Sequence, residues 1–135
     1  MHNQDALLVG KVDCTRYTSI ATHFSVKGFP TILFINSDQT IEYRGDRNKQ
    51  DILDFALRMN GPSVRQTTCN EIESLREKHG VFFIHFGDNI IHQFTQIAKK
   101  YQNIDWFYHS IQLCDGFSSG IYVVKQNKIQ FKFGN

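Results

Sequence analysis

Hydrophobic and polar positions alternate along the chain as two successive series of strands and helices, separated at Gly61-Pro62. In the first series, the apolar stretch from about Leu7 to Cys14 predicts a strand, and Ile20–Phe24 predicts a short helix. Pro30 and the residues before it end that helix, because proline lacks an amide proton and favours extended geometry in the residue before it. Thr31–Ile35 is a nearly continuous β-branched and aromatic run, which predicts a strand buried on both faces.

A hairpin and a helix complete the first series. Asn36–Gln39 predicts a turn, and Thr40–Arg44 alternates polar and apolar positions as an edge strand does. Between Lys49 and Asn60 the apolar positions recur at helical spacing, and Gly61-Pro62 supplies the stop signals. We expect this helix to pack on the sheet through its apolar stripe, which consists of Ile52, Leu53, Phe55, Ala56 and Met59.

The second series repeats the alternation of strand and helix. Thr68 and Glu71 have the spacing of a capping box, Gly80 is a helix stop, and Asp88 or Asn89 is suited to cap the next helix. The predicted elements are a helix over 68–79, a strand over 81–86, a helix over 88–101, a strand over 104–108, and a hairpin formed by 120–124 and 129–133.

Composition and charge exclude several classes of function. Of the 135 residues, 41% are hydrophobic and 21% charged, which is typical of a packed globular protein. The net charge of +2 comes from scattered residues, so the sequence predicts no binding to nucleic acid or to an anionic membrane. No apolar run approaches the roughly 20 residues of a membrane span, and Met1–Asp5 does not begin a secretory signal.

Cysteines and histidines suggest no reactive site. Cys14, Cys69 and Cys114 are too far apart for a redox dithiol or a zinc knuckle, and their odd number argues against a closed disulfide framework. We expect three buried free thiols without a resolving partner.

Metal and cofactor sites are not expected either. Three of the six histidines, His79, His85 and His92, fall on separate elements without acidic or cysteine ligands at fixed spacing, so we expect no metal. The segment Gly116–Gly120 lacks the lysine and the following helix that a phosphate-binding loop needs, so we expect no cofactor.

Two stretches of the first series, Val9–Asp13 and Phe24–Thr31, resemble the middle of a protein disulfide isomerase catalytic domain. Gly28-Phe29-Pro30-Thr31 is the glycine-aromatic-proline-threonine sequence that recurs there, and Tyr43–Arg47 continues the match. Within the family the likeness is strongest to the transmembrane thioredoxin-related isomerases of the endoplasmic reticulum, in particular the third type.

The resemblance implies a thioredoxin-like α/β fold. Residues 1–61 would form the C-terminal half of a catalytic-type thioredoxin domain without its dithiol. Residues 62–135 would form most of a second, redox-inactive thioredoxin-like domain without its last helix.

The resemblance also assigns site residues. Pro30 matches the family's cis-proline, and Phe29 matches the residue whose main chain pairs with an extended substrate. Arg47 matches a loop arginine that favours a thiolate in catalytic domains, but without a thiol beside it we expect a solvated loop residue. No catalytic residue is expected, since the Cys-x-x-Cys of the family has no counterpart.

Two hypotheses follow from the resemblance. In the first, the chain is a fragment or shortened form of an endoplasmic-reticulum protein disulfide isomerase, a family that exchanges disulfides in unfolded or cysteine-containing secretory polypeptides, and it is itself redox-inactive. In the second, it is a non-catalytic, chaperone-like module that binds polypeptides. In the family fold, another strand separates Val9–Cys14 from Thr31–Ile35, so we also expect self-association through unpaired strand edges.

Overall fold

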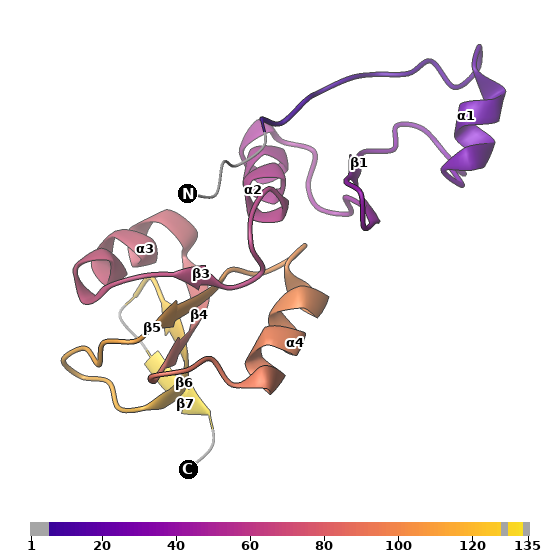
Figure 1. Ribbon diagram of the computed structural model, residues 1–135. Coiled ribbons are helices and arrows are strands. Elements are labelled where there is room, and N and C mark those ends of the chain that lie inside the picture. Colours follow the sequence, from indigo (N-terminus) through magenta and orange to yellow (C-terminus); the bar gives the residue numbers. More distant parts are fainter. Residues whose placement is uncertain (1–5, 128–129, 134–135) are drawn as a thin grey trace. The chain divides into compact units, whose positions relative to one another are not determined.

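A computed structural model describes residues 6–127 and 130–133 and contains two compact units, residues 1–56 and 57–135 (Figure 1). The boundary between the units falls inside a helix, five residues before the domain boundary between Gly61 and Pro62 that is predicted from the sequence. Assignment of each unit to a separate thioredoxin domain remains a prediction.

The first unit is built around a small hairpin. Its elements are α1 (Thr18–His23), β1 (Leu33–Ile35), β2 (Thr40–Glu42) and the larger part of α2 (Lys49–Met59). β1 and β2 pair antiparallel with Phe34 opposite Ile41, and the Asn36 side chain accepts hydrogen bonds from the amides of Asp38 and Gln39, both at 2.9 Å. The predicted hairpin and turn are confirmed.

Helix α2 packs on this hairpin through the predicted apolar stripe. Phe55 is buried, and its ring lies 6.4 Å from that of Phe34 and 5.0 Å from that of Tyr43. Leu53, which the sequence also placed in the stripe, is 43% exposed. The helix bounds are confirmed to within one residue.

Two expectations for the first unit are wrong. Residues 9–14 form no strand, and Val9 is 96% exposed, because no neighbouring strand satisfies its main chain. β1 is only three residues long and none of them is fully buried, since one partner strand and one helix cover it incompletely.

The second unit is a five-stranded sheet in the order β3-β5-β4-β6-β7. The three strands β3 (Arg65–Gln66), β5 (Phe107–Ser110) and β4 (Val81–Phe86) are parallel, and β6 (Gly120–Lys125) and β7 (Gln130–Phe133) are antiparallel to their neighbours. The short strand β3 was not predicted, because two residues carry no periodic signal.

Helices lie on both sides of the sheet (Figure 1), and the buried residues form two separate hydrophobic cores. Phe82, Ile84 and Phe86 of β4 pack with residues of α3 (Ile72–His79), which follows the short 3₁₀ helix η1 (Cys69–Glu71). Phe83 faces the other core, which contains Phe94 of α4 (His92–Tyr101). The side chains of β4 therefore alternate between the two cores, as the pleat of a strand requires.

Helix starts in this unit differ from prediction. The hydroxyl of Thr68 donates to the Glu71 carboxylate at 3.4 Å instead of accepting from a helix amide, so the capping box is wrong. Helix α4 begins at His92 after an Ile91 N-cap, because the chain turns at Gly87, whose amide donates to the Ser110 carbonyl. Asp88 and Asn89 therefore do not cap it.

The ends of the remaining elements are close to prediction. Helix α3 stops at His79 as expected, and Gly80 adopts a φ of 71°, a left-handed conformation that favours glycine. The strand expected at 104–108 runs from Phe107 to Ser110. The final hairpin is confirmed over Gly120–Lys125 and Gln130–Phe133. Ile129, which was predicted to begin its second strand, and Met1–Asp5 lie outside the described residues.

Candidate functional site

The segment Gly28–Thr31 lies between α1 and β1 as an exposed turn. The peptide bond between Phe29 and Pro30 is cis, and the Phe29 side chain is 67% exposed. The Thr31 hydroxyl donates to the Gly28 carbonyl at 2.7 Å. Within the described residues no hydrogen bond engages the main chain of Phe29, so its amide and carbonyl are available to an extended partner.

Arg47 lies in the loop between β2 and α2, and its side chain is exposed. Neighbouring residues shape this loop: the Tyr43 hydroxyl donates to the Asp46 carbonyl, and the Asn48 side chain accepts from the Asp51 amide at 2.8 Å. In the part of the chain that the structure covers, no hydrogen bond or ion pair joins Arg47 to Phe29 or Pro30.

Cys14 is a free thiol in a polar turn. It is half-buried, and it follows Asp13, whose carboxylate accepts hydrogen bonds from the amide and the hydroxyl of Thr15 at 3.0 and 2.6 Å. These hydrogen bonds lower the pKa of Asp13. Cys14 is thus not one of the buried thiols that the sequence led us to expect.

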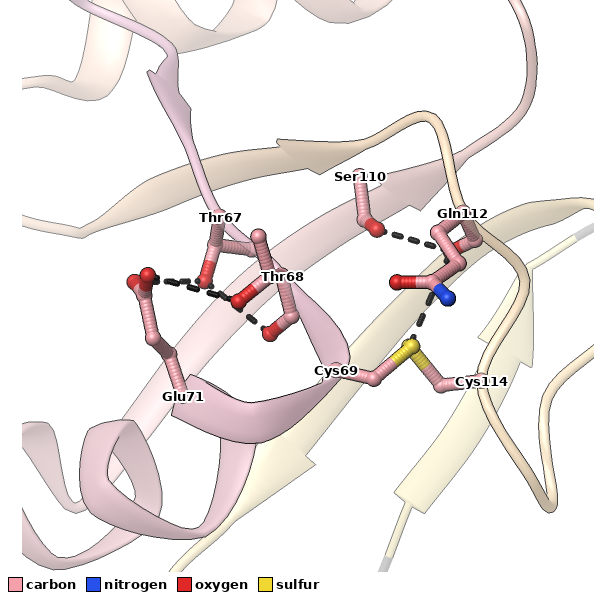
Figure 2. The surroundings of a disulfide bond; sticks show 7 residues. All are labelled: Thr67, Thr68, Cys69, Glu71, Ser110, Gln112 and Cys114. Carbon is pink, nitrogen blue, oxygen red and sulfur yellow. Dashed lines mark hydrogen bonds between the residues drawn. A yellow bond between two sulfur atoms is a disulfide. The ribbon is translucent and has the colours of Figure 1, made fainter.

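Cys69 and Cys114 form a disulfide bond, which overturns the expectation of free thiols without a partner (Figure 2). Cys69 begins η1, and Cys114 lies in the connection between β5 and β6, 45 residues further along the chain. Cys114 is 8% exposed and belongs to the core beneath α3, while Cys69 packs against that core from its edge. Only the folded sheet brings these two residues together.

Polar contacts surround the disulfide (Figure 2). The hydroxyls of Thr67 and Thr68 donate to the two oxygens of the Glu71 carboxylate at 3.1 and 3.4 Å. On the other side, the Ser110 hydroxyl donates to the Gln112 carbonyl at 2.7 Å. The disulfide therefore joins a hydrogen-bonded helix start to the connection that leaves β5.

Two histidines form a second buried polar cluster in this unit. His85 and His109 face each other across β4 and β5 with ring centroids 5.4 Å apart. Nε2 of His109 lies 2.9 Å from the Gly87 carbonyl oxygen, and its Nδ1 lies 3.1 Å from Oε1 of Gln66. Burial, and to a lesser extent the neighbouring His109, lower the pKa of His85.

Neither the disulfide nor the histidine pair was predicted from the sequence. A usable signal for the histidine pair was that His85 and His109 lie near the ends of two successive apolar runs. The second predicted strand, however, stopped at residue 108, one residue before His109. No signal of spacing pointed to the disulfide, because its two cysteines come from elements that are not consecutive.

The described residues contain no group of three or more histidine, cysteine or acidic side chains able to hold a metal ion. His79 accordingly has a structural setting: its ring stacks on that of Trp106 at 4.1 Å and its Nε2 lies 2.6 Å from the Tyr108 hydroxyl. Burial raises the pKa of Tyr108 to about 12.

Across the described part of the chain, no helix is both long enough and apolar enough to cross a membrane.

Sequence comparisons match the chain to a thioredoxin family model and to proteins named as protein disulfide-isomerases. The thioredoxin family model matches residues 1–58. Protein disulfide-isomerase TMX3 of Xenopus laevis is 38% identical over 95 residues, which is 68% of this chain and 21% of that protein. The Homo sapiens protein of the same name is 42% identical over 80 residues, 58% of this chain and 18% of its own length. The chain thus spans about a fifth of the length of the curated relatives it matches.

Solved structures give weaker matches. The crystal structure of human ERp44 form I covers 92% of this chain and 36% of its own, with 15% identity and a TM-score of 0.43. ERdj5 form II covers 91% of this chain and 19% of its own, with 17% identity and a TM-score of 0.39.

Proposed function

Because the chain belongs to the protein disulfide isomerase family of thioredoxin-like proteins, we propose that it supplies a polypeptide-holding part of a thiol–disulfide oxidoreductase and is itself redox-inactive. The predicted thioredoxin-like α/β fold class is confirmed. The parent activity is disulfide exchange in cysteine-containing secretory polypeptides, and this chain represents a fragment or shortened form of such an isomerase.

The arrangement of the cysteines carries the proposal of redox inactivity. A catalytic dithiol holds its resolving thiol beside the attacking one, so that a mixed disulfide with the substrate is released within the same site. Here Cys69 and Cys114 are joined to each other, Cys114 is buried, and Cys14 is a single thiol. No two cysteines of the sequence have Cys-x-x-Cys spacing.

The polypeptide-holding role is assigned to Phe29 and Pro30. The exposed Phe29 ring offers apolar contact area, and its unengaged main chain can pair with an extended segment as a strand would. Because the sequence has no Cys-x-x-Cys dithiol, Arg47 has no catalytic target, and we assign it the role of a solvated loop residue.

An endoplasmic-reticulum location is part of the proposal. Disulfides persist in oxidising compartments, so the Cys69–Cys114 bond agrees with the location that the family implies. The proposed partners are unfolded secretory polypeptides, with a second copy of the chain binding through the open edges of the β1–β2 hairpin. No nucleic acid, metal or cofactor is proposed.

Insulin reduction by glutathione tests the redox proposal. We expect the protein to leave the rate at the glutathione background, and the Cys14→Ser variant to behave identically. A rate above that background with the wild-type protein would overturn the proposal.

A second candidate function is that of a chaperone-like module acting without any oxidoreductase. The observation that favours it is the exposure of apolar side chains in the first unit, with Leu8 94% and Phe29 67% exposed. A reduced client protein that aggregates on dilution provides the assay, and equimolar chain should delay its light scattering.

Two variants separate specific binding from general stickiness. Phe29→Ala should shorten the delay at least twofold, while Ile104→Ala, at a site with 62% exposure, should leave it unchanged. An absence of protection by the wild-type chain, or equal effects of both variants, would rule out the Phe29 site.

A further inference from the structure

We propose that the Cys69–Cys114 disulfide is a site of thiol–disulfide exchange with an external thiol, attacked at Cys69, and that its opening releases residues 111–115. The proposal goes beyond the polypeptide-holding function and agrees with the absence of catalytic turnover, because the disulfide of the second unit is here a target of external thiols and not a catalyst.

The two cysteine residues differ in exposure. Cys114 is 8% exposed and lies in the core that includes Ile72 and Leu75, whereas Cys69 is only partly buried at the edge of that core. Cys69 is also flanked by the exposed residues Thr68 and Asn70. A thiolate must approach the sulfur it attacks in line with the bond that breaks, so the open side of Cys69 is the route of entry.

Apart from the burial of Cys114 in the core, the segment after β5 depends on this bond for its position. Ile111 and Leu113 are 63% and 55% exposed and pack against no core. The other described polar contacts of residues 111–115 are local: the Ser110 hydroxyl donates to the Gln112 carbonyl, the Cys114 sulfur lies 3.6 Å from the same carbonyl oxygen, and the Phe117 amide donates to the Cys114 carbonyl. Within the described residues, the disulfide is therefore the only covalent or hydrogen-bonded tie from this segment to a distant part of the chain.

The following residues are held independently of the disulfide. The Phe117 ring packs on Phe86 and Tyr122 at centroid distances of 4.6 and 5.0 Å. The Gln130 side-chain amide donates to the Gly116 carbonyl at 3.0 Å, and the Ser118 amide donates to the Tyr122 hydroxyl at 3.0 Å. Opening the bond therefore frees a short segment while the sheet stays folded.

Glutathione or a dithiol acts as the reductant and supplies the two electrons that opening the disulfide requires. The incoming thiolate forms a bond to the Cys69 sulfur, and Cys114 leaves as a thiolate that takes up a proton from water. A second thiol then attacks the incoming sulfur and releases Cys69 as a thiol. Two electrons pass to the disulfide, and the reductant is oxidised to its own disulfide. Once open, the pair is not held together as a catalytic dithiol is, so exchange at this site does not provide turnover.

Graded dithiothreitol, added to the native protein without denaturant, tests the opening. Maleimide labelling followed by mass spectrometry should show two additional labelled thiols, at Cys69 and Cys114. Hydrogen exchange should rise at least tenfold in residues 111–115 and stay unchanged in β4. The proposal is overturned if the bond resists reduction until the sheet unfolds, or if exchange rises throughout β4.

Glutathione tests the direction of attack in the Cys14→Ser variant, whose change lies in the other unit. Acid quenching at early times should trap the glutathionyl group on Cys69 in at least tenfold excess over Cys114. Equal trapping, or an excess on Cys114, would contradict attack at Cys69. Both readouts are independent of insulin turnover, so the proposed function and this inference can fail separately.

Discussion

His85 and His109 stack across two parallel strands with ring centroids 5.4 Å apart and an angle of 21° between their planes. Both side chains are buried, and Nδ1 of His85 has no hydrogen-bond partner among the described residues. The neighbours around the pair are neutral: the Gln66 amide on β3, the Gly87 carbonyl at the end of β4 and the Phe94 ring on α4. A positive charge on His85 would therefore be placed beside another titratable ring, and no described residue supplies a compensating anion there.

Stability of the second unit should consequently fall on mild acidification. The folded-state pKa of His85 lies below the ordinary value of 6.5, so the unfolded chain binds more protons in the window below 6.5. Stability is complete above that pH and decreases as the pH falls towards the lowered folded-state pKa, by at most about 1.4 kcal/mol per pH unit for one group.

Urea denaturation between pH 7.5 and 5.5 checks this dependence. His85→Phe should flatten the slope, whereas His92→Gln, at an exposed position on α4, should retain it. An unchanged slope in His85→Phe would show that another group is responsible.

Removal of the disulfide should destabilise the second unit. In the chain-entropy model, a loop of this length is worth about 4 kcal/mol at most, and measured values are typically about 2 to 4 kcal/mol. The double variant Cys69→Ala, Cys114→Ala should lose that amount of unfolding free energy in urea. Cys14→Ser should change the free energy by less than about 0.5 kcal/mol. A double variant as stable as the wild type would contradict the predicted stabilisation.

Phe55 should be the main anchor of α2 on the hairpin. Its ring is 3% exposed and contacts the rings of Phe34 and Tyr43, so Phe55→Ala should cost about 3 to 5 kcal/mol locally. Hydrogen exchange of the β1–β2 amides should accelerate strongly. Leu53→Ala, on the exposed face of the same helix, is the matched control and should have little effect. Equal acceleration in both variants would contradict a specific role for Phe55.

Gln102 should stabilise the second unit by hydrogen-bonding the C-terminal end of α2. Its side-chain amide donates to the carbonyls of Arg58 and Gly61 at 3.0 and 2.9 Å, and it is 9% exposed. Gln102→Leu leaves these carbonyls without that donor and should cost about 1 to 3 kcal/mol in urea denaturation. Gln96→Leu, exposed on α4, should be nearly neutral. The prediction fails if the two variants are equally stable.

Local patterns were sufficient wherever the element depends on its own residues. The apolar spacing and the stop signals placed α2 to within one residue, and the continuous run Val81–Phe86 identified β4. Pro30 and its neighbours carried the family resemblance, and Gly80 marked the end of α3. These features follow from main-chain geometry and hydrophobic periodicity, which are encoded over a few consecutive residues.

Tertiary structure decided the rest. The run near Val9 has the composition of a strand, but a strand needs a neighbour to pair with, and the structure provides none among the described residues. Cys69 meets Cys114, and His85 meets His109, only because β3, β5 and β4 lie side by side in an order that differs from their order in the chain. The sequence by itself determined most of the helices and strands and the family, while the sheet order determined which distant side chains came into contact.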